Sequence, residues 1–146
     1  MALWLGFLRS VVIYHNPVAM RAWRRFYRGI LAPGDLVIDV GAHVGTRARA
    51  MRAAGAQVVA LEPQHPFAGY LRLTLPRDIT WIEAAAGATE TEAEMAVSSR
   101  HPTVSSLRGD FVEGARDAPG FGHVKWYRRQ RVRMVTLDGL IARYGV

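Results

Sequence analysis

The hydrophobic positions follow two kinds of spacing along this chain. Apolar residues recur at helical intervals over 2–13 and again over 17–30, which predicts two amphipathic helices at the start. Further on, short unbroken apolar runs replace that spacing at 36–40, 57–61 and 79–82. Unbroken runs are typical of strands covered on both faces, as in a parallel sheet.

Helix-like segments separate the three runs. Segments 46–54 and 67–75 each carry apolar residues on one face, and Gly55 and Pro76 act as stop signals behind them. Strand, helix, strand, helix, strand at this spacing predicts a βαβαβ unit with right-handed connections. We therefore expect an α/β fold of three layers with a mostly parallel sheet.

The pattern of apolar and polar residues changes after the third run. Residues 94–98 and 131–137 alternate between apolar and polar, which predicts two strands that pair antiparallel, and 137–144 has the pattern of a helix. Between the two strands, residues 99–122 are rich in Gly, Pro, Ser and Asp, and we expect a long loop there.

We divide the chain into N-terminal amphipathic helices at 1–33 and a second domain at 34–146. Asn16 and Pro17 predict an N-cap and a first-turn proline for the second helix. The first apolar stretch is too short for a membrane span and is interrupted by Arg9. A helix packed on its own domain is the favoured interpretation, and a helix on a membrane surface is the weaker alternative.

Composition narrows the class of protein. With 50% hydrophobic and 21% charged residues, the 146-residue chain has the balance of a globular protein. The absence of Cys excludes disulfides and thiolate zinc sites and favours a reducing, cytoplasmic location. The net charge of +7 resides in the two ends, while the middle is slightly acidic. A uniform nucleic-acid-binding surface would not have this slightly acidic middle, so we expect no nucleic-acid partner.

A glycine loop follows the first unbroken run. Gly41 and Gly45 allow left-handed backbone and close approach of a ligand, and the next helix offers free N–H groups to an anion. Glu62 ends the second run, where a carboxylate can accept both hydroxyls of a ribose. These features predict an adenosine-containing ligand, either a dinucleotide or S-adenosylmethionine. The alternative without a ligand is that Gly41 and Gly45 only close the turn between strand and helix and that Glu62 is a capping residue at the surface.

Two details favour S-adenosylmethionine. Ala42 and His43 stand where the dinucleotide fingerprint has its middle glycine. Asp39, two residues before the loop, would repel a pyrophosphate but suits the ammonium and sulfonium of S-adenosylmethionine. A nicotinamide-dependent Rossmann enzyme is the less favoured alternative.

Four segments together resemble the FkbM-type family of S-adenosylmethionine-dependent methyltransferases: Asp39–Gly45, Val59–Pro63, Glu83–Gly87 and Val135–Asp138. The resemblance covers residues 24–144 and implies a Rossmann-like, class I methyltransferase fold. It implies that the methionine end lies on Asp39, Gly41, Ala42, His43 and Gly45, the ribose on Glu62 beside Pro63 and Gln64, and the adenine near Ala84 and Ala85. The loop 102–107 would lie over the cofactor or the acceptor.

The family has a further strand, reading Lys-Ile-Asp-x-Glu-Gly, after the Leu-Asp-x-Leu helix. This sequence ends before it, so we expect a domain incomplete in its C-terminal half, in which strand 36–40 lacks a neighbour on one side.

The expected function is methylation of a small-molecule or sugar hydroxyl. A hydroxyl acceptor calls for a general base. The candidates are His43, His101, Asp110 and His123, none of which we assign, so the catalytic residue stays unknown. The histidine spacing indicates no metal site. The alternative function is a truncated, non-catalytic remnant or a binding module with basic ends.

Overall fold

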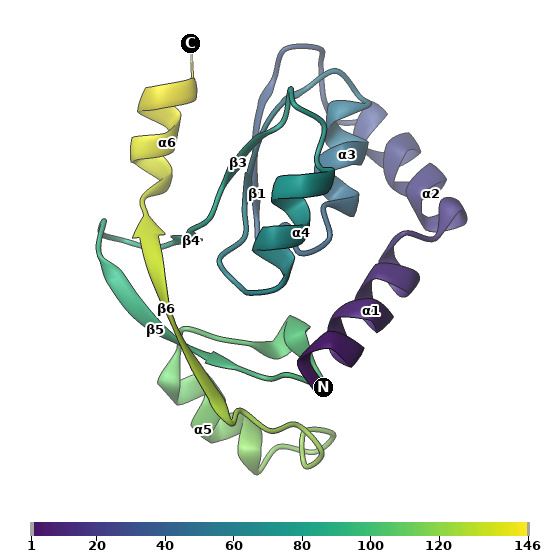
Figure 1. Cartoon of the computed structure of the whole chain (residues 1–146). Helices are drawn as coiled ribbons and strands as arrows, with labels where there is room; N and C mark the ends of the chain where they lie inside the picture. Colours follow the sequence, from purple (N-terminus) through teal and green to yellow (C-terminus); the bar gives the residue numbers. More distant parts are fainter. Residues whose placement is uncertain (1, 146) are drawn as a thin grey trace.

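The computed structural model describes residues 2–145 (Figure 1). Its first half contains α1 (Ala2–Tyr14), α2 (Pro17–Arg28), β1 (Leu36–Val40), α3 (Thr46–Arg52), β2 (Gln57–Leu61), α4 (Phe67–Thr74) and β3 (Thr80–Ile82). Its second half contains β4 (Ala85–Ala86), β5 (Glu92–Val97), the short 3-10 helix η1 (Pro102–Val104), α5 (Gly109–Arg116), β6 (Arg128–Val135) and α6 (Leu137–Tyr144).

The first sheet is parallel, with strand order β1-β2-β3. Asp39 of β1 lies opposite Ala60 of β2, which lies opposite Trp81 of β3. The predicted βαβαβ unit is therefore confirmed as an α/β arrangement that is compatible with a Rossmann-like fold. Within residues 2–145, β1 has only β2 as a neighbour, so it is an edge strand as expected.

Strand β2 is covered on both faces, which explains its unbroken apolar run. Val58 and Ala60 pack in a cluster with residues of α3 and α4. Val59 and Leu61 pack on the opposite face, in a cluster with Leu140 of α6. Because successive side chains of a strand point to opposite faces, a strand between two helical layers needs apolar residues at every position.

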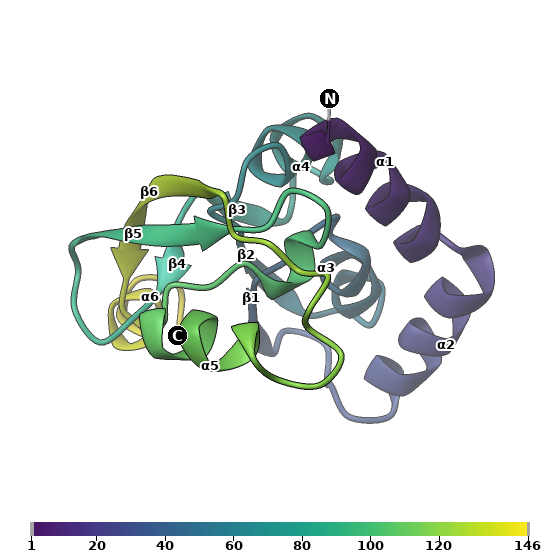
Figure 2. The ribbon, with the colours of Figure 1, turned by 90° about the horizontal axis from the view of Figure 1, so that it is seen from below.

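The second sheet has the order β4-β6-β5 and lies beside the first (Figure 2). Strand β5 is antiparallel to β6, with Glu92 opposite Arg133 and Val97 opposite Arg128. This pairing confirms the antiparallel strands that the alternating pattern predicts. Strand β4 runs parallel to the other edge of β6.

The prediction of a long loop at 99–122 is wrong in part, because η1 and α5 form within this segment. Val112 and Ala115 of α5 are buried against Val124 and Trp126. The Trp126 indole donates a hydrogen bond of 2.8 Å to the carbonyl of Val104. A small apolar cluster thus stabilises helical structure in a segment whose composition favours turns.

Helix α1 packs on the parallel domain, as the favoured interpretation predicts. The ring of Phe7 contacts those of Phe67 and Tyr70, with centroids 5.4 Å apart in both pairs. Asn16 caps α2 by accepting a 2.8 Å hydrogen bond from the Val18 N–H. In residues 2–145 no helix combines the length and apolar character needed to cross a membrane.

The apolar positions expected to face inward on α1 and α6 are wrong in part. Trp4 and Leu8 repeat at helical spacing with Phe7 and yet are 59% and 55% exposed. In α6, Leu140 is buried, whereas Leu137 and Ile141 are exposed. A helix at the edge of a domain buries a narrow stripe, so spacing alone does not select which apolar residues belong to it.

Candidate functional site

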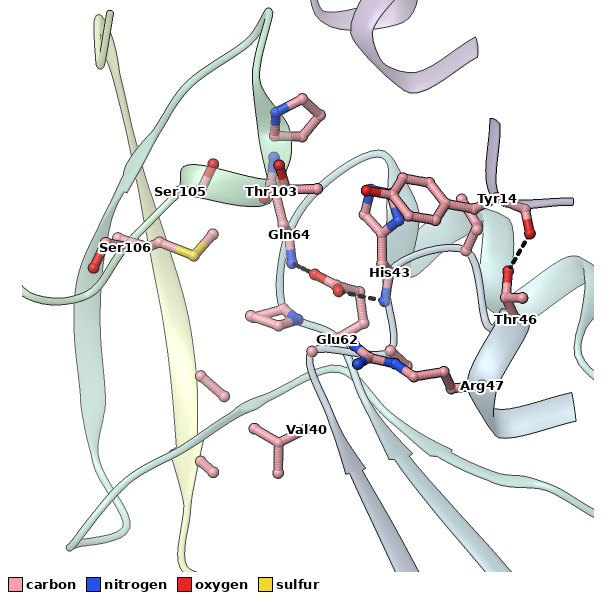
Figure 3. A pocket seen from close by; sticks show the side chains of 18 of the residues that line it. Tyr14, Val40, His43, Thr46, Arg47, Glu62, Gln64, Thr103, Ser105 and Ser106 are labelled. Atoms are coloured by element: carbon pink, nitrogen blue, oxygen red, sulfur yellow. Dashed lines mark hydrogen bonds between the residues drawn. The ribbon is translucent and has the colours of Figure 1, made fainter. Parts of the chain in front are cut away.

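A cavity of about 870 Å³ lies at the carboxyl ends of the parallel strands (Figure 3). Its size falls within the range of small-molecule and cofactor sites. The glycine loop 41–45, the start of α3 and the segment 62–64 form one side. The other lining residues come from β1, β4, β5 and β6, from the loop 102–108 and from the helices α1 and α2. The site thus occupies the edge of the sheet where ligands bind in open α/β folds.

The glycine loop turns tightly over the end of β2. The N–H groups of Gly41 and Ala42 both donate to the carbonyl of Leu61, at 3.0 and 2.8 Å. Left-handed backbone occurs at Gly41 (φ 76°), at His43 (φ 55°) and at Gly45 (φ 75°). A left-handed histidine is uncommon, because its Cβ crowds the neighbouring backbone.

The two glycines serve different purposes. A Cβ added to Gly41 would meet no atom within 4 Å, so its surface is open to a ligand. A Cβ on Gly45 would lie 3.0 Å from Cδ2 of Leu71 and of Leu75. Close packing against α4 therefore requires Gly45, which does not line the cavity.

Glu62 holds the loop with both of its carboxylate oxygens. Oε2 accepts a hydrogen bond from the His43 backbone N–H, and Oε1 accepts one from the Gln64 N–H, each at 2.8 Å. The side chain lines the cavity, and the residue is only 6% exposed. Each oxygen retains a second lone pair that can accept a further hydrogen bond.

Burial controls the protonation of Glu62. Desolvation, with a smaller contribution from the charge of Asp39, raises the pKa of Glu62 to about 7, while the two backbone hydrogen bonds oppose the rise. A carboxyl with this pKa is close to half-protonated at neutral pH, so it can both accept and donate a hydrogen bond.

The ring of His43 lies in an aromatic setting. Its centroid is 4.2 Å from that of Phe67 and 5.0 Å from that of Tyr14, and its buried Nε2 has no hydrogen-bond partner within the described residues. Burial, and then the charge of Arg47, lower the pKa of His43 to about 4. The imidazole is thus neutral at pH 7 and a weak general base.

Asp39 is buried but faces α3 rather than the cavity. Its carboxylate accepts a hydrogen bond from the Ala48 N–H in the first turn of that helix. Burial raises the pKa of Asp39, and the nearby charge of Arg47 and the Ala48 hydrogen bond oppose the rise. Its Oδ2 atom has no partner among residues 2–145.

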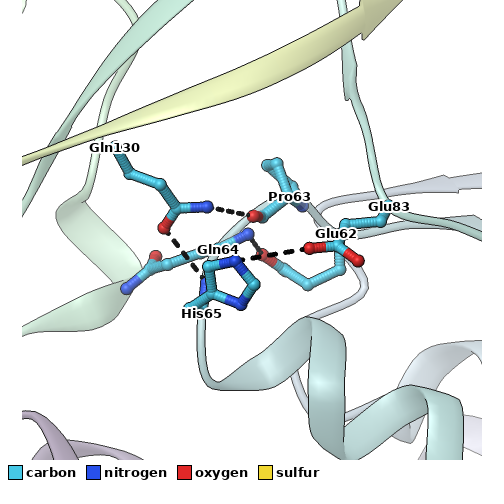
Figure 4. Close-up of polar contacts among 6 residues, drawn as sticks. All are labelled: Glu62, Pro63, Gln64, His65, Glu83 and Gln130. Atoms are coloured by element: carbon cyan, nitrogen blue, oxygen red, sulfur yellow. Dashed lines mark hydrogen bonds and ion pairs between the residues drawn. The ribbon is translucent and has the colours of Figure 1, made fainter.

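Gln130 of β6 fixes the turn that follows Glu62 (Figure 4). Its Nε2 donates to the carbonyl of Pro63 at 2.6 Å, and its Oε1 accepts from the His65 N–H at 3.1 Å. The neighbouring Gln64 is buried in the cavity wall, and its Nε2 has no partner in the described part of the chain. No sequence signal indicates Gln130, because these contacts join positions more than sixty residues apart.

The ends of the loop are tied to neighbouring helices. The Thr46 hydroxyl donates to the carbonyl of Tyr14 at 2.8 Å, which joins α1 to the start of α3. Arg49 donates to the carbonyls of Val44 and Thr74, at 2.7 and 3.0 Å. The helical pattern predicts a solvent-facing Arg49, and this is wrong, because its guanidinium reaches carbonyl groups of the loop and of α4.

The structure brings most of the predicted residues together at one cavity. The lining contains Gly41, Ala42, His43, Glu62, Pro63, Gln64 and Ala85. Asp39, Gly45 and Ala84 are buried and do not line it. The base candidates His101, Asp110 and His123 also lie outside the lining. The sequence did not indicate other lining residues, which include Ile13, Tyr14, Trp23, Arg47, Met95, Arg108 and Met134.

No protein-family model, curated protein or solved structure matches the chain. In the described residues, no three His, Asp or Glu side chains are grouped so that they could hold a metal ion. The fold and site therefore define an α/β protein with a ligand-sized cavity at the carboxyl edge of its parallel sheet, and a more specific function rests on the chemistry of that cavity.

Proposed function

We propose that the cavity binds S-adenosylmethionine and that the protein is a class I methyltransferase acting on a hydroxyl group of a small molecule or sugar. The observation that supports this best is the pairing of two buried polar side chains in the wall. Glu62 offers lone pairs and Gln64 offers an unpaired amide donor beside the open surface of Gly41. The hydroxyls of a ribose diol can donate to the carboxylate and accept from the amide at such a position.

The remaining wall fits the other parts of this cofactor. Ala85, Ala86, Met95 and Met134 provide an apolar surface of small and pliable side chains suited to a heterocyclic base. The backbone of Gly41 allows close approach of the amino-acid portion, and the Arg47 side chain lies nearby for its carboxylate. When bound, S-adenosylmethionine supplies an electrophilic methyl group on a sulfonium centre.

The far wall suits a hydroxylated acceptor. Thr103, Ser105 and Ser106 line it, and hydroxyl groups both donate and accept hydrogen bonds. Arg108 adds a cation at the same rim. We assign no general base, because the lowered pKa of His43 makes it a poor proton acceptor at neutral pH.

The proposal is tested by calorimetric titration with S-adenosylhomocysteine. We expect binding to the full chain and its loss in Glu62→Ala. Gln64→Ala is the second variant: its amide has no partner to lose, so affinity falls while the fold is kept. Glu113→Ala is the matched control, an exposed acid of α5 outside the lining. Unchanged affinity in both site variants contradicts the proposal.

Two competing functions are separated by further titrations. If a nicotinamide dinucleotide binds more tightly than S-adenosylhomocysteine, the proposal is wrong and a nicotinamide-dependent enzyme is the better interpretation. The basic ends of the chain favour a second candidate, a non-catalytic binding module. Transfer of a labelled methyl group to any hydroxylated acceptor contradicts that candidate.

A further inference from the structure

The outward face of α1 is apolar. Trp4, Leu5, Leu8 and Val12 are 59%, 63%, 55% and 76% exposed. At 3.6 residues per turn, these four side chains span about 100° of the helix circumference. The adjoining face of α1 packs on the domain through Phe7. Contiguous exposed apolar surface of this kind marks an interaction site rather than ordinary scatter.

The outward face of α2 is basic. This helix has no buried residue, and it exposes four arginines: Arg21, Arg24, Arg25 and Arg28. Residues 1–33 contain no Asp or Glu. None of the four arginines forms an ion pair within residues 2–145. These cations are therefore available to an anionic partner.

The two helices form one continuous edge of the molecule. Figures 1 and 2 both show α1 leading into α2 along the outside, away from β6 and α6. Exposed Val18 and Phe26 place apolar side chains among the arginines of α2, and Arg9 places a cation in α1. Apolar and cationic groups are thus presented together.

We propose that the α1–α2 edge docks on the surface of an anionic phospholipid bilayer. The apolar stripe of α1 enters the boundary between headgroups and acyl chains, and the arginines of α2 bind lipid phosphates. A helix of 13 residues is too short to span a bilayer, so α1 lies in the plane of the interface.

Charge and polarity favour this partner over two others. A nucleic acid would satisfy the arginines but leave the Trp4–Val12 stripe in water. A second copy of the chain could cover the stripe, but it would bring two acid-free, arginine-rich helices together. An anionic bilayer matches both features at once.

The first test is co-sedimentation of the full chain with vesicles. We expect binding to equimolar phosphatidylcholine and phosphatidylserine and little binding to phosphatidylcholine alone. Replacing Arg21, Arg24, Arg25 and Arg28 by Gln lowers partitioning roughly fivefold for each arginine at low ionic strength. The matched control replaces four exposed arginines elsewhere, Arg72, Arg77, Arg116 and Arg143, so that net charge changes equally. Equal binding to both vesicles, or an equal loss in the control, overturns the proposal.

The second test examines the apolar stripe. We expect Leu8→Gln combined with Val12→Gln to lower partitioning at least tenfold, since about 0.8 kcal/mol is lost for each CH₂ withdrawn from the bilayer. Trp4 reports insertion through a blue shift of the emission, and we expect this shift to be smaller in Trp4→Phe, which keeps the other three tryptophans. If the stripe variants change only the oligomeric state in sedimentation equilibrium, or a duplex oligonucleotide binds while vesicles do not, the proposal is wrong. None of these measurements uses the cofactor, so the outcome is separate from that of the proposed function.

Discussion

The backbone N–H of His43 donates a hydrogen bond of 2.8 Å to Oε2 of Glu62, across nineteen positions of sequence. The acid at the end of β2 thereby holds the glycine loop in its left-handed conformation before any ligand arrives. Its other oxygen, Oε1, accepts a hydrogen bond from the Gln64 N–H and so holds the turn that follows β2. A preorganised site of this kind loses less conformational entropy on binding.

The two residues of this contact give opposite dependences of stability on pH. Glu62 has a pKa of about 7 in the folded protein against an ordinary 4.5, so the folded state binds more protons and stability falls as pH rises through 4.5 to 7. His43 has a pKa of about 4 against an ordinary 6.5, so stability rises with pH from 4 to 6.5. In the native protein the two slopes largely cancel.

Single variants separate these slopes. In Glu62→Gln only the rise due to His43 remains. Between pH 4 and 6.5 the free energy of unfolding of this variant therefore increases by up to about 3 kcal/mol more than that of the native protein. In His43→Asn, a residue that tolerates left-handed backbone, the fall due to Glu62 remains. Urea unfolding at a series of pH values measures both. Parallel pH curves in all three proteins contradict the assignment.

The two glycines of the loop predict a contrasting pair of variants. Gly45→Ala combines left-handed backbone strain with contacts to Leu71 and Leu75 and destabilises by about 2–4 kcal/mol. Gly41→Ala has open space around the new methyl group and costs about 1–2 kcal/mol. Under the proposed function, Gly41→Ala also weakens S-adenosylhomocysteine binding. Thermal unfolding and calorimetry measure the two effects, and equal destabilisation contradicts the packing argument.

Gln130 is predicted to be a positioning residue. Gln130→Ala removes the hydrogen bonds to Pro63 and His65 and costs about 1–3 kcal/mol in total. Hydrogen exchange of the His65 amide should accelerate while amides of β2 keep their protection. Gln57→Ala, which removes one long hydrogen bond at the opposite end of β2, is the control. An unchanged His65 exchange rate would show that the turn holds without Gln130.

Helix α1 contributes to stability through Phe7. Phe7→Ala should destabilise by about 3–5 kcal/mol, because it leaves a cavity against Phe67 and Tyr70. Leu8→Ala, at the adjacent exposed position, should change the free energy of unfolding by about 0.5 kcal/mol or less. Chemical denaturation measures both. Similar losses in the two variants would mean that α1 does not pack as described.

Much of the architecture follows from local pattern. Unbroken apolar runs located β1, β2 and β3, because a strand between two layers needs apolar residues on both faces. Gly41, Gly45 and Glu62 marked the loop and the strand end that form one side of the cavity. The alternating pattern located β5 and β6 and their antiparallel pairing. The proposed cofactor stays a prediction.

Tertiary structure decided what local pattern could not. Asp39 and Gly45 lie next to cavity-lining residues in the sequence, but both are buried outside the lining. Which residues line the cavity depends on the elements packed around them, and local pattern does not show this. Helix α5 forms in a turn-rich segment because Val112 and Ala115 find a partner in Trp126. Gln130 reaches the site only through the pairing of distant strands. Local pattern thus determined the elements and the loop of this protein, while long-range packing determined which side chains line the cavity and which face of α1 stays exposed.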